Sequence, residues 1–485
     1  MSKQENLKKN YIYRMIYEVL LLITPFITTP YVSRVLGADG IGDYSFTHSL
    51  ITYFMLFGAL GTASYGQREI ARHRNNKFLA SKLFWEIELL TVMTTGVCLL
   101  GWIGVIIFSA KYRYHYLALT PFLLGTMFDI SWFFSGYEKV KNIVLRNSAV
   151  RFFSIILLFI FVKHKNDVII YCVINSVSSL MGALSMWMYL PGMLTKVNFR
   201  ELRFGHHFHE TLIYFIPTIA ASVYTVLDKT LIGAITGSSF QNGYYEQATK
   251  IINIVKSMVF VAVNSVLGAR ISWLFAEQRF DEIKKRISHS MDFIYLLAYG
   301  SIFGIIGVSS RFVPLFFGKG FDPVVRLLYI MSPLILVIGT SNCLGHQYYT
   351  PSGQRKRSAK YIILGAFVNL IMNLILIPHY GAAGATIASL CAEMVITFMY
   401  VHMSDGYMTW RQLWDFTWKR LIAGVCMCLG VIIIGKTLVL NDLPVVVLQI
   451  AAGILIYAGL LTLMKDSMAF ELFHLGRNTL YKIKR

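Results

Sequence analysis

The chain has 485 residues, of which 56% are hydrophobic and only 14% charged, and its formal net charge is +20. A soluble protein of this length cannot bury so much apolar surface, so the composition predicts a membrane protein whose surface is covered by lipid. The basic residues are spread over many short segments, which argues against nucleic acid as a partner, because anionic lipid headgroups explain them equally well.

About 14 apolar segments follow one another with short connections, and each is near the roughly 20 residues that a helix needs to cross a bilayer. The first one lacks a convincing small-residue cleavage site, so we interpret it as an uncleaved span. No connection is long enough for a soluble domain. The predicted spans are 11–32, 41–60, 83–108, 115–135, 144–162, 166–190, 211–235, 247–269, 291–310, 324–348, 360–378, 383–402, 419–439 and 445–464.

The connections between these spans alternate between rich and poor in Lys and Arg. Most of the 45 basic residues lie in the N-terminal tail and in every second connection, ending with the C-terminal segment 465–485. Such an asymmetry marks the cytoplasmic side of a membrane protein. We therefore expect an even number of spans, with both termini in the cytoplasm.

Tryptophans recur at helical spacing just before the thirteenth span. Trp410, Trp414 and Trp418 are four residues apart, with basic residues nearby. The pattern predicts a helix that lies at the membrane surface. The tail from Met468 onward mixes aromatic and basic residues in a similar way.

A faint internal repeat divides the chain. Gly42-Asp43-Tyr44 recurs as Gly243-Tyr244-Tyr245, and Gly125-Thr126 recurs as Gly339-Thr340. Six predicted spans separate the copies, so both have the same orientation. Two-lobe transporters are built in this way, with the substrate between the lobes. We expect an N-terminal lobe over 1–195, a C-terminal lobe over 196–405, and an interfacial helix, two further spans and a cytoplasmic tail over 406–485.

Several segments resemble the Wzx-type polysaccharide flippases, which share a superfamily with the MATE exporters and the lipid II flippase. The similarity is most specific in residues 20–75 and extends over the first twelve spans. The segments that carry it are Pro25-Phe-Ile-Thr-Thr-Pro-Tyr-Val-Ser-Arg-Val-Leu-Gly37, Gly40-Ile-Gly-Asp-Tyr44, Leu60-Gly61, Tyr65-Gly-Gln-Arg-Glu-Ile-Ala-Arg72, Asp129-Ile-Ser-Trp-Phe-Phe-Ser-Gly136 and Leu227-Asp-Lys-Thr-Leu-Ile-Gly233.

The resemblance implies an all-α fold of two six-helix lobes around a central cavity. It also implies a substrate, an undecaprenyl-diphosphate-linked oligosaccharide that moves from the inner to the outer leaflet of the bacterial cytoplasmic membrane for O-antigen, capsule or exopolysaccharide synthesis. Partners would be this substrate, membrane lipids and other polysaccharide-assembly proteins of the membrane.

Charged residues inside predicted spans are the candidate functional residues, because such charges are costly and usually bind or pair with something. Asp129 and Arg151 are about equally far from the turn that joins their spans. At 1.5 Å per helical residue they would lie at similar depth on neighbouring helices. They are either a structural ion pair or part of a transport site.

Asp228, Lys229 and Lys256 likewise lie at similar distances from the connection 236–246. One acid faces two bases, so a structural pair would leave one cation for a diphosphate headgroup, which Lys and Arg bind well. Arg34 ends the first span within a family-like segment, and Glu393 lies in the twelfth. The candidate substrate-binding residues are Lys229, Lys256, Arg34 and Arg151, and the candidate charge-balancing residues are Asp228, Asp129 and Glu393.

The sequence shows no catalytic constellation and no Gly-rich nucleotide loop, so we expect a transporter that is neither an enzyme nor a direct user of ATP. The six cysteines lie in or beside apolar segments and predict neither a disulfide framework nor a metal site. His206, His207 and His209 lie in a predicted loop and are expected to be solvated. No cofactor is expected.

Three other functions remain as alternatives. A MATE-like, ion-coupled exporter of small amphiphilic molecules should have an acid-rich internal site, whereas bases predominate here. A polysaccharide polymerase should have a large outer loop, and a scaffold gives no reason for charges inside the spans.

Overall fold

The computed structural model describes residues 3–438 and 440–474, and within these residues it contains helices and no strand. The expected all-α fold is therefore confirmed. In chain order the helices are α1 (Lys3–Ala59), α2 (Thr62–His73), α3 (Lys77–Phe108), α4 (Arg113–Met127), α5 (Ser131–Gly136), α6 (Val140–Phe161), α7 (Val168–Trp187), the 3₁₀ helix η1 (Phe199–Glu201), α8 (Phe204–Thr236), α9 (Ser239–Ala276), α10 (Phe280–Phe317), α11 (Asp322–Met331), α12 (Leu334–Leu344), the π-helix η2 (Gly345–Tyr349), α13 (Arg355–Tyr380), α14 (Ala382–His402), α15 (Trp410–Thr437) and α16 (Asp442–Leu463).

Eleven segments of the described residues are long and apolar enough to cross a bilayer. One of them, Ile23–His73, contains the predicted span 41–60 and the second half of the predicted span 11–32. Between the two, α1 changes direction at Gly37, whose φ of 71° interrupts the helix. Only glycine adopts such a positive φ without strain. The exact number of 14 spans stays a prediction.

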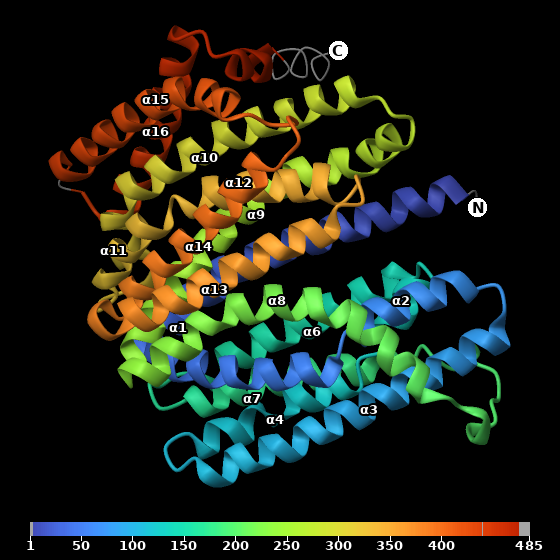
Figure 1. Cartoon of the computed structure of the whole chain (residues 1–485). Helices are drawn as coiled ribbons and strands as arrows, with labels where there is room; N and C mark the ends of the chain where they lie inside the picture. The colour runs from blue at the N-terminus through green and yellow to red at the C-terminus, as the bar shows by residue number, and fades with distance from the viewer. Residues whose placement is uncertain (1–2, 439, 475–485) are drawn as a thin grey trace. The chain divides into compact units, whose positions relative to one another are not determined.

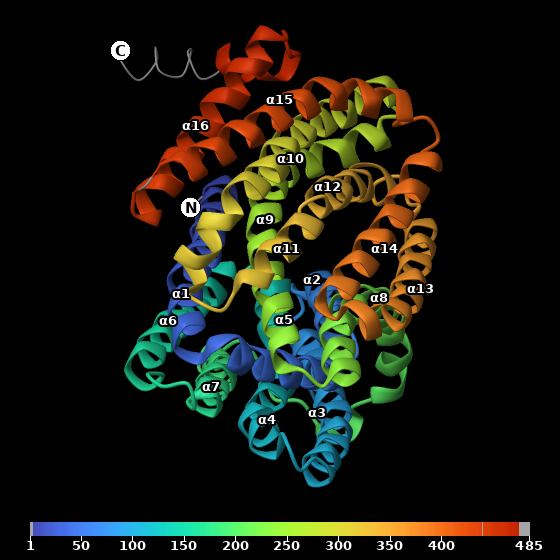
Figure 2. The same cartoon turned by 90° about the vertical axis from the view of Figure 1, so that its left-hand side faces the viewer.

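The chain forms two compact units, which are described separately here as the N-terminal unit (residues 1–243) and the C-terminal unit (residues 244–485). Figures 1 and 2 show the helices of each unit from two directions. In the N-terminal unit, α8 packs against α1, α2 and α3. The expected lobe boundary near residue 195 stays a prediction.

Within the N-terminal unit, α1 also packs against α3 and α4, and α7 packs against α4 and α6. The fourth predicted span, 115–135, is interrupted: α4 ends at Met127 and α5 begins at Ser131. Asp129 lies in this break, where its carboxylate accepts hydrogen bonds from the backbone and the hydroxyl of Ser131, at 3.1 and 3.0 Å. A short aspartate side chain that bonds its own backbone two residues on stabilises such a turn.

Two family-like segments pack together around this break. A Cβ on Gly66 in α2 would lie 2.5 Å from the Trp132 ring, and one on Gly136 would lie 2.7 Å from Ile70, so both glycines allow α2 and α5 to touch. The result is a core of α2, α3 and α5 side chains. Its buried members include Tyr65, Ile70, Leu83, Phe84, Ile87, Trp132, Phe133 and Phe134.

In the C-terminal unit, α10 packs against α15 and α16, and α13 packs against α14. The tenth predicted span, 324–348, is divided at Pro333 into α11 and α12 and ends in the π-helix η2. A π-helix inside a helical segment often marks a functional site. The expected separate surface helix at Trp410 is wrong, because α15 runs without a break from Trp410 to Thr437.

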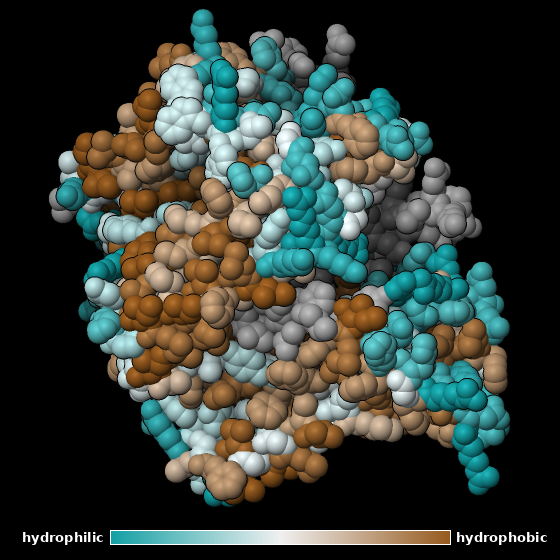
Figure 3. All heavy atoms as spheres, viewed as in Figure 1, coloured by the Kyte–Doolittle hydropathy of each residue, from teal (hydrophilic) through white to brown (hydrophobic). Residues whose placement is uncertain are grey.

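The three tryptophans therefore lie on the first turns of a spanning helix, where each is at least 41% exposed. Tryptophan is common at this level because its ring is amphipathic. Figure 3 shows hydrophobic side chains over α13 and α14 on the face in view, as expected for helices that lipid covers. Of the predicted cytoplasmic tail, residues 475–485 lie outside the described residues.

Candidate functional site

Two of the predicted charged residues in the C-terminal unit lie near each other. Lys256 of α9 is half-buried, and the Glu393 carboxylate of α14, in a side chain that is 9% exposed, is close enough to act on it electrostatically. The neighbouring acid had been expected to be Asp228. Lys256 thus has an acidic neighbour within its own unit. That either residue contacts the substrate stays a prediction.

Asp228 is buried on α8, beside the contact between α8 and α1. Its carboxylate acts electrostatically on the Tyr53 hydroxyl, which accepts a 3.2 Å hydrogen bond from the Thr230 hydroxyl. Thr230 also shares a 2.9 Å hydrogen bond with Ser49. A polar strip therefore joins α1 and α8. Lys229, the next residue, is half-buried.

Asp129 and Arg151 do not form the predicted ion pair in the part of the chain that the structure describes. Asp129 is engaged with Ser131 at the helix break, and Arg151 lies half-buried on α6. The depth calculation assumed an unbroken fourth span, and the break at Asp129 removes that assumption. Arg34 is exposed on α1. A role of either arginine in binding stays a prediction.

The structure gives Asp43, in the segment Gly40–Tyr44, a role that the sequence did not reveal. Its Oδ1 accepts hydrogen bonds from the Tyr112 hydroxyl at 3.1 Å and from the Ser239 hydroxyl at 2.5 Å. These donors precede α4 and begin α9. Asp43 therefore links α1, at a position just after Gly37, to the start of α4 and the start of α9.

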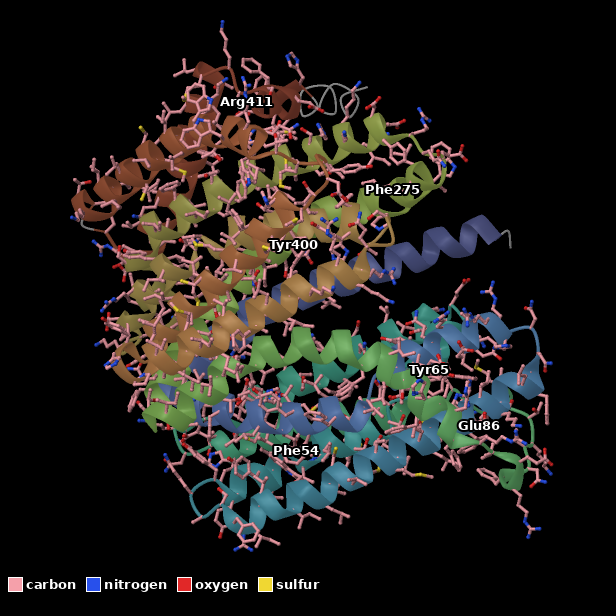
Figure 4. All side chains as sticks on the ribbon, in the orientation of Figure 1. Phe54, Tyr65, Glu86, Phe275, Tyr400 and Arg411 are labelled. Atoms are coloured by element: carbon pink, nitrogen blue, oxygen red, sulfur yellow. The ribbon has the colours of Figure 1, made fainter. Side chains whose placement is uncertain are left out.

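A buried polar chain connects α2, α3 and α8, and the sequence analysis missed it. The Tyr65 hydroxyl bonds His207 Nδ1 at 2.8 Å, and His207 Nε2 bonds Glu86 Oε2 at 2.9 Å. The other Glu86 oxygen accepts from the backbone N–H of Arg203. Figure 4 shows Tyr65 and Glu86 near each other at one end of this unit, away from Phe54.

The prediction that all three histidines are solvated is wrong for His207, which is 5% exposed. Helix α8 begins at Phe204, earlier than the predicted 211, so His207 lies on a helix face that packs against α3. His206 and His209 are exposed. In the sequence, the signal that could have revealed these hydrogen-bonded residues is the presence of an acid, Glu86, inside the predicted span 83–108.

The sequence analysis also did not identify a second buried acid on α3, two residues after Glu86. Glu88 is 1% exposed, and neither of its carboxyl oxygens has a hydrogen-bond partner. Asp129 is close enough to act on it electrostatically.

In the C-terminal unit, Arg420 is fully buried between two acids. Its guanidinium lies 2.5 Å from Asp292 Oδ1 of α10 and 3.1 Å from Asp466 Oδ1, beyond the end of α16. The sequence analysis did not single out Arg420 as a candidate functional residue. No group of three or more His, Cys, Asp or Glu side chains suited to a metal ion occurs among the described residues.

Known proteins are similar to this chain in sequence and in fold. The model of the family "Polysaccharide biosynthesis protein" matches residues 7–272, and that of "Lipid II flippase MurJ" matches residues 144–452. The "Putative O-antigen transporter" of Escherichia coli (strain K12) is 26% identical over 406 residues, which are 81% of this chain and 95% of that protein.

Solved structures show the same fold at low identity. The lipid II flippase MurJ in an inward closed conformation has a TM-score of 0.69 at 15% identity, and the match covers 94% of this chain and 98% of that one. The MATE multidrug transporter DinF-BH has a TM-score of 0.58 at 15% identity, covering 83% of this chain and 95% of that one.

The fold is thus that of multi-pass membrane transporters of the MurJ and MATE type. Because a family model matches more than half of its length, the chain belongs to the polysaccharide biosynthesis protein family. The resemblance seen in the sequence is confirmed.

Proposed function

We propose that this polysaccharide-precursor flippase moves undecaprenyl-diphosphate-linked oligosaccharide repeat units from the inner to the outer leaflet of a bacterial cytoplasmic membrane. The observation that carries the proposal is the match of the polysaccharide biosynthesis family model over residues 7–272. The relative from Escherichia coli, which bears the name of an O-antigen transporter, supports the same substrate class.

The chemical problem in this reaction is the diphosphate, because its charge cannot cross hydrocarbon alone. A fixed cation in a site of low dielectric constant stabilises such a charge far better than the same cation in water. The N-terminal unit offers Lys229, Arg34 and Arg151 for this purpose, and the C-terminal unit offers Lys256. We propose that the cations of each unit, taken by itself, bind the diphosphate.

The acid beside Lys256 has a role in release. A cation that holds the diphosphate too tightly would prevent the lipid from leaving. Glu393 lies within electrostatic range of Lys256, so it balances this charge when no substrate is present and competes with the diphosphate during release. Asp228 and Asp129 balance charge in the N-terminal unit.

We also propose that the basic connections, and with them both termini, lie on the cytoplasmic side, because Lys and Arg in short connections favour that side. The product would then enter the outer leaflet, where other membrane proteins of polysaccharide assembly take it over.

The test is export of lipid-linked sugar in cells that lack their own flippase and carry Lys229→Gln, Lys256→Gln or both, at equal membrane levels. We expect each single variant to lose export by about tenfold or more, since one charge-assisted hydrogen bond contributes roughly 1.5–3 kcal/mol. Arginine at either position should restore much of the export. Lys250→Gln is a matched control, because Lys250 lies on the same helix and pairs with Glu246.

Normal export by the double variant would refute the role of these lysines. Failure of the unaltered protein to export lipid-linked sugar, together with resistance to cationic drugs, would instead favour a MATE-like exporter. That alternative has the support of the shared fold alone.

A further inference from the structure

Helix α9 has a polar face within the predicted membrane span 247–269. At about 100° per residue, several polar side chains fall within about 120° of the helix circumference. These residues form the polar face of α9: Glu246, Thr249, Lys250, Asn253, Lys256 and Ser257. Of the other residues from Glu246 to Val259, all but Gln247 are apolar. The helix is therefore amphipathic over this segment.

The polar face is the open one, and much of the apolar face is buried. On the apolar side, the residues that are at most 8% exposed are Ala248, Ile251, Ile252, Ile254 and Val259. On the polar side, Asn253 is exposed, and Lys256 and Ser257 are half-buried. Helix α13 has the reverse arrangement, because apolar residues such as Phe367 and Leu374 are exposed there, as expected beside lipid.

Lipid cannot cover the polar face. Asn253 lies 14 residues after the start of α9 at Ser239 and 23 residues before its end at Ala276. At 1.5 Å per residue these are about 21 and 34 Å, so Asn253 lies within the roughly 30 Å of hydrocarbon. Polar side chains at such a depth face protein or a water-filled space. Because the described residues leave Asn253 exposed, the polar face lines a water-filled path.

The groups that this face offers are mostly neutral. Lys250 Nζ lies 3.7 Å from Glu246 Oε1, so the two charges compensate each other. The Asn253 amide can donate two hydrogen bonds and accept others. One turn away, the Thr249 hydroxyl has no hydrogen-bond partner in the described part of the chain. Amides and hydroxyls suit the hydroxyl groups of a sugar, whereas a cationic drug would require acids without a basic partner.

We propose that Asn253, with Thr249 and Ser257, binds the sugar of the lipid-linked oligosaccharide and determines which sugars are accepted. This inference rests on the proposed function. Asn253 is three residues from Lys256, about 4.5 Å along the helix axis, so it can reach a sugar joined to a diphosphate that Lys256 holds. A site that hydrogen-bonds one sugar group rejects a sugar without it, because the protein group then loses its partner.

Cysteine labelling tests whether the polar face is open to water. In a protein without the six native cysteines, Asn253→Cys should react with a water-soluble thiol reagent, because the reactive thiolate forms in water. Phe367→Cys, at an exposed but apolar position of α13, is the control and should react at least about tenfold more slowly. Equally slow reaction of both variants would overturn the proposal.

Lipid binding to the purified protein tests the sugar contact. The probes are undecaprenyl diphosphate alone and the same lipid with one N-acetylglucosamine or one galactose. The unaltered protein should bind one sugar lipid more tightly than the other and than the bare lipid. Asn253→Ala should weaken binding of the preferred lipid about threefold to tenfold, as one or two neutral hydrogen bonds predict, and should leave binding of the bare lipid unchanged.

Two variants make this result specific. Lys256→Gln should weaken binding of all three lipids equally, since each carries the diphosphate. Asn75→Ala, at an exposed asparagine in the turn between α2 and α3, should weaken none. Asn253→Gln keeps an amide and should retain part of the preference. All of these positions lie outside the buried core, so the variants should fold.

Three outcomes would overturn the sugar contact: an equal loss of all three lipids in Asn253→Ala, no loss at all, or no preference for either sugar lipid in the unaltered protein. If the unaltered protein bound none of the lipids, the proposed function would fail and the sugar contact with it. The labelling of Asn253→Cys would still decide whether the polar face is open to water.

Discussion

Gly42 of α1 and Gly243 of α9 lie where two helix backbones touch. A Cβ on Gly42 would lie 1.7 Å from the carbonyl oxygen of Ser239 and 3.0 Å from the backbone nitrogen of Gly243, and a Cβ on Gly243 would lie 1.8 Å from the carbonyl oxygen of Ala38. Small residues four apart on each helix, Ala38 with Gly42 and Ser239 with Gly243, permit this approach. The two glycines are the same pair that the internal repeat matched.

Because of this contact, Gly42→Ala and Gly243→Ala should each prevent normal packing of α1 on α9. We expect at least a severalfold loss of folded protein in the membrane, measured by size-exclusion chromatography of a fluorescent fusion. Gly104→Ala is the control, since a Cβ there would have open space, and it should leave the level unchanged or raise it. Normal levels of the Gly42→Ala and Gly243→Ala variants would contradict the close approach.

The hydrogen bonds that join Tyr65, His207 and Glu86 should stabilise the packing of α8 against α3. Removing His207 leaves one oxygen of the buried Glu86 carboxylate without its hydrogen bond, and a hydrogen bond to a charged group typically contributes about 1.5–3 kcal/mol. We expect His207→Ala to lower the thermal unfolding temperature markedly, whereas His206→Ala, a change of its exposed neighbour, should have little effect. Equal unfolding temperatures of the two variants would show that the buried chain contributes nothing to stability.

A similar argument applies to Arg420 in the C-terminal unit. Arg420→Met leaves the buried Asp466 beside the partly buried Asp292 with no cation between them, so the folded protein should become several kcal/mol less stable. Adding Asp292→Asn and Asp466→Asn should recover much of the loss, because no buried charge then remains. Arg411→Gln, at an exposed position on the same helix, serves as control. A triple variant no more stable than Arg420→Met would show that the ion triad does not explain the effect.

Composition and hydrophobic runs were sufficient to predict an all-α membrane fold, because lipid exposure requires long apolar helices. They could not predict interruptions. The depth of Asp129 in the membrane was predicted from the rise per residue of an unbroken helix. Asp129 instead lies in the turn between α4 and α5, so that predicted depth does not hold. The start of α8 was misplaced for a related reason, since polar residues such as His207 also occur on a helix face when buried partners exist.

The structure also differs from the sequence-based expectation in which residues lie near the candidate charges. The acid near Lys256 comes from α14, more than a hundred residues away along the chain, and spacing along neighbouring helices cannot reveal such a contact. Glu86 and Glu88 could have been found, because acids inside an apolar run of this length are costly and therefore informative.

The stability of the loop after α14 should depend on pH. The pKa of Asp405 lies below its ordinary value because the Tyr348 hydroxyl donates a hydrogen bond to its carboxylate, with further bonds from Gln354 and Arg357. A lowered folded-state pKa contributes stability above the ordinary value of about 4, and this contribution disappears as the pH falls through the folded value.

Asp405→Asn should therefore lower the unfolding temperature at pH 7 and should match the unaltered protein at acid pH, below the folded pKa. The effect should be under about 1 kcal/mol, because the Asp405 side chain is half exposed. A difference that persisted in acid would show that the carboxylate charge is not its cause. Asp415→Asn, for which no such hydrogen bonds occur in the described residues, is the control.

The orientation in the membrane follows from the charge asymmetry and can be tested by cysteine labelling. In a background without the six native cysteines, Lys111→Cys and Lys163→Cys should react with an impermeant thiol reagent added to intact cells, because both exposed positions belong to the base-poor connections. Lys196→Cys and Lys356→Cys, also exposed but in base-rich connections, should react only after the membrane is opened. The reverse pattern would place both termini outside. Reaction of all four positions from one side would show instead that the expected alternation of the connections is wrong between residues 111 and 356.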